Sequence, residues 1–194
     1  MKKISSILIA GFFLLSVPAF TQIQQGNILA GGDIASFDLG LEKGSAFNMT
    51  INPKLGFFIK DNLAVGPDIL LGLTSFSGET SFSYGIGALG RYYFSDKENM
   101  SPLRHSRFFV EGTAGFRGFN VSGGGSSTNG LGLGVGPGLA YFITPNIGLE
   151  ALLKYNGLVG FGNETTQSSL NLSVGFQIYL PSKNLKNKVA NDVK

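Results

Sequence analysis

Cysteine is absent from this 194-residue chain, which excludes disulfides, thiolate metal sites and a lipidated N-terminal cysteine. His105 is the only histidine, so histidine-dependent catalysis would have a single residue to use. Charged residues make up 14% of the chain, which is few for the surface of a soluble protein. No segment after residue 22 keeps a helical period. These shortages favour an all-β protein without a metal site or cofactor.

The apolar stretch at residues 7–17 is too short to span a bilayer comfortably. Two lysines precede it, and small residues stand at 19 and 21. This pattern predicts a secretory signal over residues 1–21, cleaved before Gln22. A retained N-terminal anchor is the alternative.

The overall basic charge comes from the ends of the chain. Residues 22–180 hold nine basic and eleven acidic side chains, a net charge of −2, which is not the charge of a nucleic-acid-binding domain. We therefore expect one domain over 22–180 and a polar, basic tail over 181–194. The tail is either a solvated end of the chain or a segment that touches an anionic surface.

Glycine is abundant, at 29 residues, and aromatics reach 12%, a combination typical of packed β structure. Residues 58–65, FIKDNLAV, return as residues 142–149, FITPNIGL. Each copy is an apolar strand end, a tight polar turn and a new apolar alternation. A repeat spaced by two hairpins is typical of an up-and-down β-barrel.

Alternation with period two predicts eight strands. They lie at about residues 27–37, 47–57, 63–74, 82–94, 108–117, 130–141, 147–156 and 169–180. One face of nearly every strand is continuously apolar, and the other is mostly Gly, Ala, Ser and Asn with a few charges. That contrast indicates an apolar face toward lipid and a narrow polar lumen, although a soluble lipocalin-like barrel remains the alternative. Bulges or local gaps are expected at Pro53, Pro67 and Pro137.

The charges on the polar face are four acids and four bases. A balanced buried set implies pairing, so we expect a salt-bridge network that plugs the lumen. The alternative is that each charge faces lumen water singly. The expected members are Asp33, Lys54, Asp68, Arg91, Glu111, Arg117, Glu150 and Lys154.

The connections are of two kinds. Tight turns at 60–62 and 144–146 share one end with both termini and the segment 95–106, whereas segments 40–45, 77–80, 121–129 and 160–167 share the other. Aromatic residues gather near the tight-turn end, where an interfacial girdle belongs. They are Phe57, Tyr92, Phe94, Phe108 and Tyr141.

Residues 173–180 read polar, x, Gly, x, x, hydrophobic, x, hydrophobic, at Ser173, Gly175, Ile178 and Leu180. With this motif, residues 26–180 resemble the OmpA/OmpX-type eight-stranded outer-membrane β-barrels, in the form common among Bacteroidetes. Two departures are a final Leu instead of an aromatic and the 14 residues that follow it. The resemblance implies periplasmic termini, recognition of the motif by the barrel assembly machinery, periplasmic chaperones as partners, and a monomer in lipid.

The expected function is structural: envelope integrity or surface contact, with no enzymatic activity. A small ion channel is one alternative. A lipid A-modifying enzyme is another, since some barrels of this size carry His and Ser at the outward end, but His105 is expected at the opposite end. The GxGxxG match at residues 85–90 continues into a strand rather than a helix, which argues against a dinucleotide site.

Overall fold

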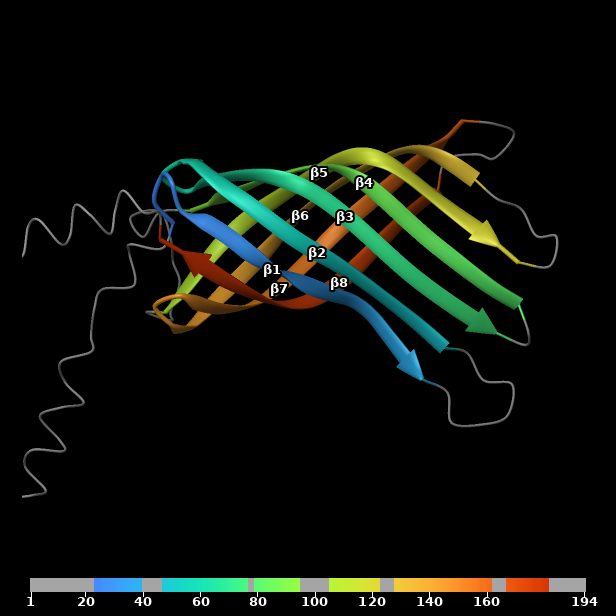
Figure 1. Ribbon diagram of the computed structural model, residues 1–194, viewed down its shortest axis with the longest axis horizontal. Coiled ribbons are helices and arrows are strands. Elements are labelled where there is room, and N and C mark those ends of the chain that lie inside the picture. Colours follow the sequence, from blue (N-terminus) through green and yellow to red (C-terminus); the bar gives the residue numbers. More distant parts are fainter. Residues whose placement is uncertain are drawn as a thin grey trace, which may run out of the picture.

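The computed structural model describes residues 23–39, 47–76, 79–94, 105–122, 128–161 and 167–181, and β-strands joined by turns are the only regular elements in these ranges (Figure 1). The predicted signal segment 1–21 and nearly all of the tail 181–194 lie outside these residues, as do most of the connections opposite the tight turns. The strands are β1 (Ile28–Leu39), β2 (Phe47–Lys60), β3 (Leu63–Phe76), β4 (Glu79–Tyr93), β5 (Ser106–Val121), β6 (Thr128–Thr144), β7 (Ile147–Gly160) and β8 (Gln167–Leu180).

Each strand pairs antiparallel with its neighbours in sequence order, and β1 also pairs with β8, which closes the barrel. The closing ladder runs from Ile28 opposite Leu180 to Ile34 opposite Val174. Closure leaves no sheet edge with unpaired backbone groups, a requirement for β structure in lipid. This confirms the predicted eight-stranded antiparallel up-and-down barrel.

Most strands extend beyond the predicted bounds. β4 begins at Glu79 rather than at 82, and β5 spans Ser106–Val121 rather than 108–117. Backbone pairing continues past the last clearly alternating side chains, so the side-chain pattern underestimates the length of the ladder.

The sequence repeat marks two equivalent turns. The chain reverses at residues 61–62 and 145–146, and the register shifts by one residue just before each, between Phe58 and Lys60 and between Phe142 and Thr144. The carbonyl groups of Asn62 and Asn146 accept hydrogen bonds from the N–H groups of Tyr93 and Tyr179. The end of the barrel that carries these turns, where β1 begins and β8 ends, is called the turn end here (left in Figure 1), and the opposite end the far end.

The outer surface of the barrel is apolar, and the lumen holds the polar residues. Ile86, Leu170 and Leu172 are each about two-thirds exposed, whereas Arg91 and Glu111 are completely buried. A soluble barrel buries its apolar face and exposes its polar face. The observed distribution is the reverse, so it contradicts the lipocalin-like alternative and agrees with a barrel surrounded by lipid.

The three strand prolines face outward and coincide with gaps in the ladders. The β2–β3 register is interrupted around Pro53 and Pro67, and the β6–β7 register around Pro137. The bulges lie elsewhere, next to the tight turns and between Ile34 and Ser36 in β1. Proline thus costs a local ladder bond without adding a residue to the strand.

Among the described residues there is no helix with the length and hydropathy needed to cross a membrane.

Candidate functional site: the filled lumen

Six of the predicted lumen charges form one connected cluster, called the charge cluster here. Its members are Asp33 on β1, Lys54 on β2, Arg91 on β4, Glu111 on β5, and Glu150 and Lys154 on β7. These positions lie in the inward phase of the strand alternation, so closure of the barrel points all six side chains at one another.

Glu111 is the centre of the charge cluster. Its carboxylate accepts from Lys54 Nζ at 2.9 Å, from Arg91 Nη2 at 2.6 Å and from Lys154 Nζ at 3.3 Å. Arg91 extends the chain of contacts to Glu150, with Nη1 at 2.7 Å from Oε2, and Lys54 also pairs with Asp33. Three acids and three bases leave no net charge, which limits the cost of holding them away from water.

Asp68 and Arg117 stand apart as a separate pair. Arg117 Nη2 contacts Asp68 Oδ2, and in the described part of the chain no ion pair joins either residue to the charge cluster. Asp68 Oδ1 and Arg117 Nη1 are buried without hydrogen-bond partners. The structure therefore divides the predicted set of eight into a cluster of six and a pair.

Between the charge cluster and the turn end of the barrel, aromatic side chains fill the lumen. Phe58, Tyr93, Phe109, Phe142 and Tyr179 form the aromatic plug, and none is more than 6% exposed. Ring centroids lie 5.1 Å apart for Phe142 and Tyr179, and 5.5 Å apart for Tyr93 and Phe109, distances typical of packed aromatic pairs.

The aromatic plug and the charge cluster are joined by hydrogen bonds. The Tyr93 and Tyr179 hydroxyls lie 2.9 Å apart, Arg91 donates to Tyr93 at 3.0 Å, and Tyr179 donates to Glu150 at 2.8 Å. The Arg91 guanidinium also lies 4.2 Å from the centroid of the Phe109 ring, a cation–π distance. The two layers are thus one continuous packed unit.

Tyr93, Phe109 and Tyr179 share the inward phase of their strands with the lumen charges, but the sequence analysis did not identify the plug. The sequence feature that could have revealed these three residues is a large aromatic side chain at a polar-face position, close to the end of the strand that lies at the turn end. Phe58 and Phe142 also carried a signal, because they open the two copies of the repeat. Only closure shows that the five rings meet.

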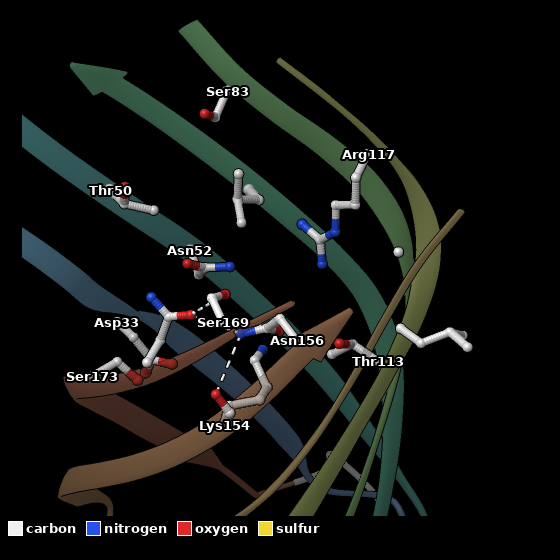
Figure 2. Close-up of a pocket in the computed structure, with 14 residues that line it drawn as sticks. Asp33, Thr50, Asn52, Ser83, Thr113, Arg117, Lys154, Asn156, Ser169 and Ser173 are labelled. Atoms are coloured by element: carbon white, nitrogen blue, oxygen red, sulfur yellow. Dashed lines mark hydrogen bonds between the residues drawn. The ribbon is translucent and has the colours of Figure 1, made fainter. Parts of the chain in front are cut away.

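Toward the far end the lumen contains a polar cavity of about 230 Å³ (Figure 2). Arg117 and Lys154 reach into it from different walls, and neutral polar side chains supply most of the rest. The principal polar lining residues are Asp33, Thr50, Asn52, Ser83, Thr113, Arg117, Lys154, Asn156, Ser169, Asn171 and Ser173.

The predicted assembly motif lies on β8. Ser173 is buried, and its hydroxyl lies 3.4 Å from the Leu152 carbonyl. A Cβ at Gly175 would overlap the Asp33 carboxylate, so this glycine makes room for the charge cluster. Ile178 and Leu180 pair with Ala30 and Ile28 along the closing ladder.

The five predicted girdle aromatics all face outward near the turn end. They are 36–46% exposed, and Tyr92 packs edge-to-face on Phe94 with ring centroids 5.6 Å apart. The set is Phe57, Tyr92, Phe94, Phe108 and Tyr141.

His105 lies at the turn end, immediately before β5, and is exposed. Its carbonyl accepts a hydrogen bond from the Phe142 N–H. The GxGxxG segment lies within β4. Within the described ranges, no three His, Asp or Glu side chains are placed to hold a metal ion.

Comparison with known proteins agrees with this architecture. The barrel is similar to the crystal structure of Neisserial surface protein A, with 23% identity and a TM-score of 0.53 over 78% of this chain and 95% of that chain. OprG from Pseudomonas aeruginosa gives 11% identity and a TM-score of 0.52 over 84% of this chain and 100% of that one. The N-terminal β-barrel domain of OprF from Pseudomonas aeruginosa has 13% sequence identity and a TM-score of 0.50. The match covers 80% of this chain and 98% of that domain's chain.

These similarities are low in sequence identity and establish the fold alone. No curated protein matches the chain. The characteristic pattern of the outer membrane protein beta-barrel domain, in contrast, matches residues 7–183, which is most of the sequence. The chain therefore belongs to the outer membrane protein beta-barrel domain family.

Proposed function

We propose that this outer-membrane barrel is a non-conducting protein of structural or surface-contact function, whose lumen is closed by the charge cluster and the aromatic plug. The observation that carries the proposal is the burial of these two layers. The side chains of Arg91 and Glu111 are 0% exposed, and all five rings of the plug are almost fully buried. We propose no enzymatic activity for it.

An ion entering the lumen would have to cross both layers. It would first have to separate oppositely charged groups in a site away from water, and such a separation leaves uncompensated buried charges. It would then have to displace packed aromatic rings, whose contacts are lost if a gap opens between them. Both costs oppose a steady open pore, in contrast to the wide, water-filled lumen of large porins.

Planar-bilayer recording tests the closure. We expect no steady conductance from the wild-type protein. The double substitution Arg91→Ala with Glu111→Ala removes one base and one acid, so the cluster stays neutral while its centre becomes empty. Because the aromatic plug stays in place, this variant alone should remain closed, and its combination with Tyr93→Ala and Phe109→Ala, which also opens the plug, should conduct ions.

The matched control is Ile86→Ala, which shortens an outward-facing side chain of β4 and should remain closed. A steady conductance of the wild-type protein would refute the closure and favour the small-channel alternative.

Membership of the family places the chain in the outer membrane, in contact with its lipid. We propose in addition that the turn end and both termini face the periplasm and that the barrel is a monomer. The girdle aromatics at the turn end support an interface there. Recognition of the β8 motif by the barrel assembly machinery and escort by periplasmic chaperones are part of the same proposal.

Single-cysteine labelling tests the orientation, because the chain has no cysteine of its own. Glu79 at the far end and Asp61 at the turn end are both exposed. In intact cells a membrane-impermeant maleimide should label Glu79→Cys and spare Asp61→Cys, and both should react after the cells are broken. The reverse labelling pattern would show that the orientation is inverted.

A further inference from the structure

The far-end half of the lumen differs from the turn-end half, since it holds a cavity instead of packed rings. The polar cavity of about 230 Å³ adjoins a second cavity of about 370 Å³, and the two share Leu70, Ser83, Arg117 and Ser169. Arg117 therefore lies at the boundary between the deeper cavity and the space beyond it. The closure of the lumen at the turn end does not require such a cavity, so it calls for a separate explanation.

Among the charged side chains that line the cavity, Arg117 is the one with a buried polar atom that lacks a partner in the described residues; Asp68 Oδ1 and Gln177 Oε1 are also unpaired, but Asp68 and Gln177 do not line the cavity. Asp33 is already engaged by Lys54 and by the Gln177 amide at 3.2 Å. Arg117 uses Nη2 on Asp68, but its Nη1 is buried and has no partner among the described residues. A guanidinium has five donors and no acceptor, and the Arg117 side chain lines the cavity and is 14% exposed, so its unused donors favour an acceptor there.

Lys154, on β7, adds a second cationic donor from a different strand of the cavity wall (Figure 2). Its ammonium lies 3.3 Å from Glu111, and its side chain is 11% exposed, whereas the other two bases of the charge cluster, Lys54 and Arg91, are at 0%. It is therefore the cluster base with most access to the cavity. An anion between Arg117 and Lys154 would be attracted by both.

Neutral polar groups complete the lining, and several are held in place. Asn156 donates to Asn171 at 3.0 Å, and Ser169 donates to the same Asn171 oxygen at 2.9 Å. Asn52 and Thr113 line other walls. Fixed amides and hydroxyls of this kind recognise the hydroxyl groups of a small polar molecule and set its orientation.

The sequence makes room for this arrangement with inward-facing glycines. A Cβ at Gly85 or at Gly132 would overlap the Arg117 side chain. A Cβ at Gly134 would lie 2.6 Å from both Asn156 Oδ1 and Thr113 Oγ1. The cavity is smaller than the roughly 300–1,000 Å³ of pockets for drug-sized molecules, so its occupant is correspondingly small.

We propose that the polar cavity is a binding site for a small, hydroxyl-bearing molecule with one oxyanion, either a carboxylate or a phosphate monoester. The oxyanion accepts from the Arg117 guanidinium and Lys154 Nζ, and the hydroxyl groups bond to the asparagine and serine side chains. The site shares Lys154 with the charge cluster that closes the lumen, but it includes no residue of the aromatic plug.

Three probes that differ in one group test the proposal: glycerol 3-phosphate, glycerate and glycerol. They are titrated into the full-length protein in detergent micelles, followed by calorimetry and by the NMR signal of the Arg117 side-chain Nε–H. We expect at least one of the two anions to bind once per barrel, shift the Arg117 signal and bind at least tenfold more tightly than glycerol. The anion that binds better identifies the oxyanion class.

Arg117→Gln should weaken binding of that anion by about tenfold or more, and the matched control Lys60→Gln, at the exposed turn end, should bind like the wild type. Ser169→Phe keeps both cations but fills the boundary between the cavities, so it should also weaken binding of the anion. If Arg117→Gln does not fold, this second variant provides the test. Equal binding of glycerol and the anions, no binding of either anion, or unchanged affinity in both cavity variants would overturn the proposal.

Discussion

At the scale of single residues, Glu111 holds the lumen together. It is the only acid in the charge cluster that contacts three bases, Lys54, Arg91 and Lys154. Each of those bases is charged and largely removed from water, so each depends on a nearby carboxylate. The loss of one carboxylate therefore affects three cations at once.

Glu111→Ala should lower the free energy of unfolding by about 3–5 kcal/mol, because it leaves buried positive charges uncompensated. Urea unfolding of the protein in lipid vesicles measures the effect. Glu79→Ala, at the exposed start of β4, is the matched control and should change stability by less than about 0.5 kcal/mol. Equal stability of the two variants would mean that lumen water, and not ion pairing, neutralises these charges.

At the scale of elements, β6 has only glycine at its inward positions between residues 130 and 138, which leaves space in the lumen for other strands. Its inward positions 130, 132, 134, 136 and 138 are all glycine and all buried. A Cβ at Gly132 would overlap Arg117, and one at Gly138 would overlap the ring of Phe109. At these two positions glycine leaves the space that long side chains of β5 occupy, whereas a Cβ at Gly130 or Gly136 would meet the backbone of β7. In this strand glycine therefore serves close packing and not flexibility.

Gly138→Ala should destabilise the barrel by about 1–3 kcal/mol, because the new methyl group forces the Phe109 ring out of the aromatic plug. Gly157→Ala is the matched control on β7, where a Cβ would meet nothing within 4 Å. Thermal unfolding in vesicles, compared by the gel mobility of boiled and unboiled samples, measures both. A loss of stability in the control as large as in Gly138→Ala would contradict this steric explanation.

At the scale of the whole molecule, the barrel has an apolar exterior and a polar interior. The outward side chains include Ile86, Leu133 and Val135, all more than half exposed. Lipid is the solvent that makes this arrangement stable, since the same surface in water would be a large exposed apolar patch.

Ile86→Lys tests this polarity. A lysine placed on the lipid face near the middle of the bilayer should cost about 2–4 kcal/mol of folding free energy in vesicles, whereas Ile86→Phe should be nearly neutral. Equilibrium unfolding from vesicles gives both values. A lysine variant as stable as the wild type would mean that this face of the barrel meets water.

Much of the fold could be predicted from the sequence, because strand alternation is a local property. The inward phase of Arg91, Glu111 and Glu150 follows from their neighbours in the chain, and so does the equivalence of the two repeated turns. The ends of β4 and β5 could not be located in this way, because ladder pairing depends on the neighbouring strand and continues where the local pattern fades.

The contacts between side chains within the lumen could not be predicted from the local sequence pattern of each strand. Tyr93 and Tyr179 are 86 residues apart and share a hydrogen bond, and Gln177 and Asp33 are 144 apart. The sequence gives no register between β1 and β8, so it cannot tell which inward side chains reach the same level of the barrel. For the same reason Asp68 and Arg117 were grouped with the other six charges rather than recognised as a separate pair.

The sequence by itself determined the eight strands, the inward and outward faces, and the balance of charge, because these follow from a period of two along each strand and from composition. Only the tertiary structure decided that the rings form a plug, that six charges form one cluster, and that a polar cavity remains beside Arg117. Closure sets strand tilt and register around the whole barrel, and these fix which distant side chains meet in a lumen too narrow to hold them independently.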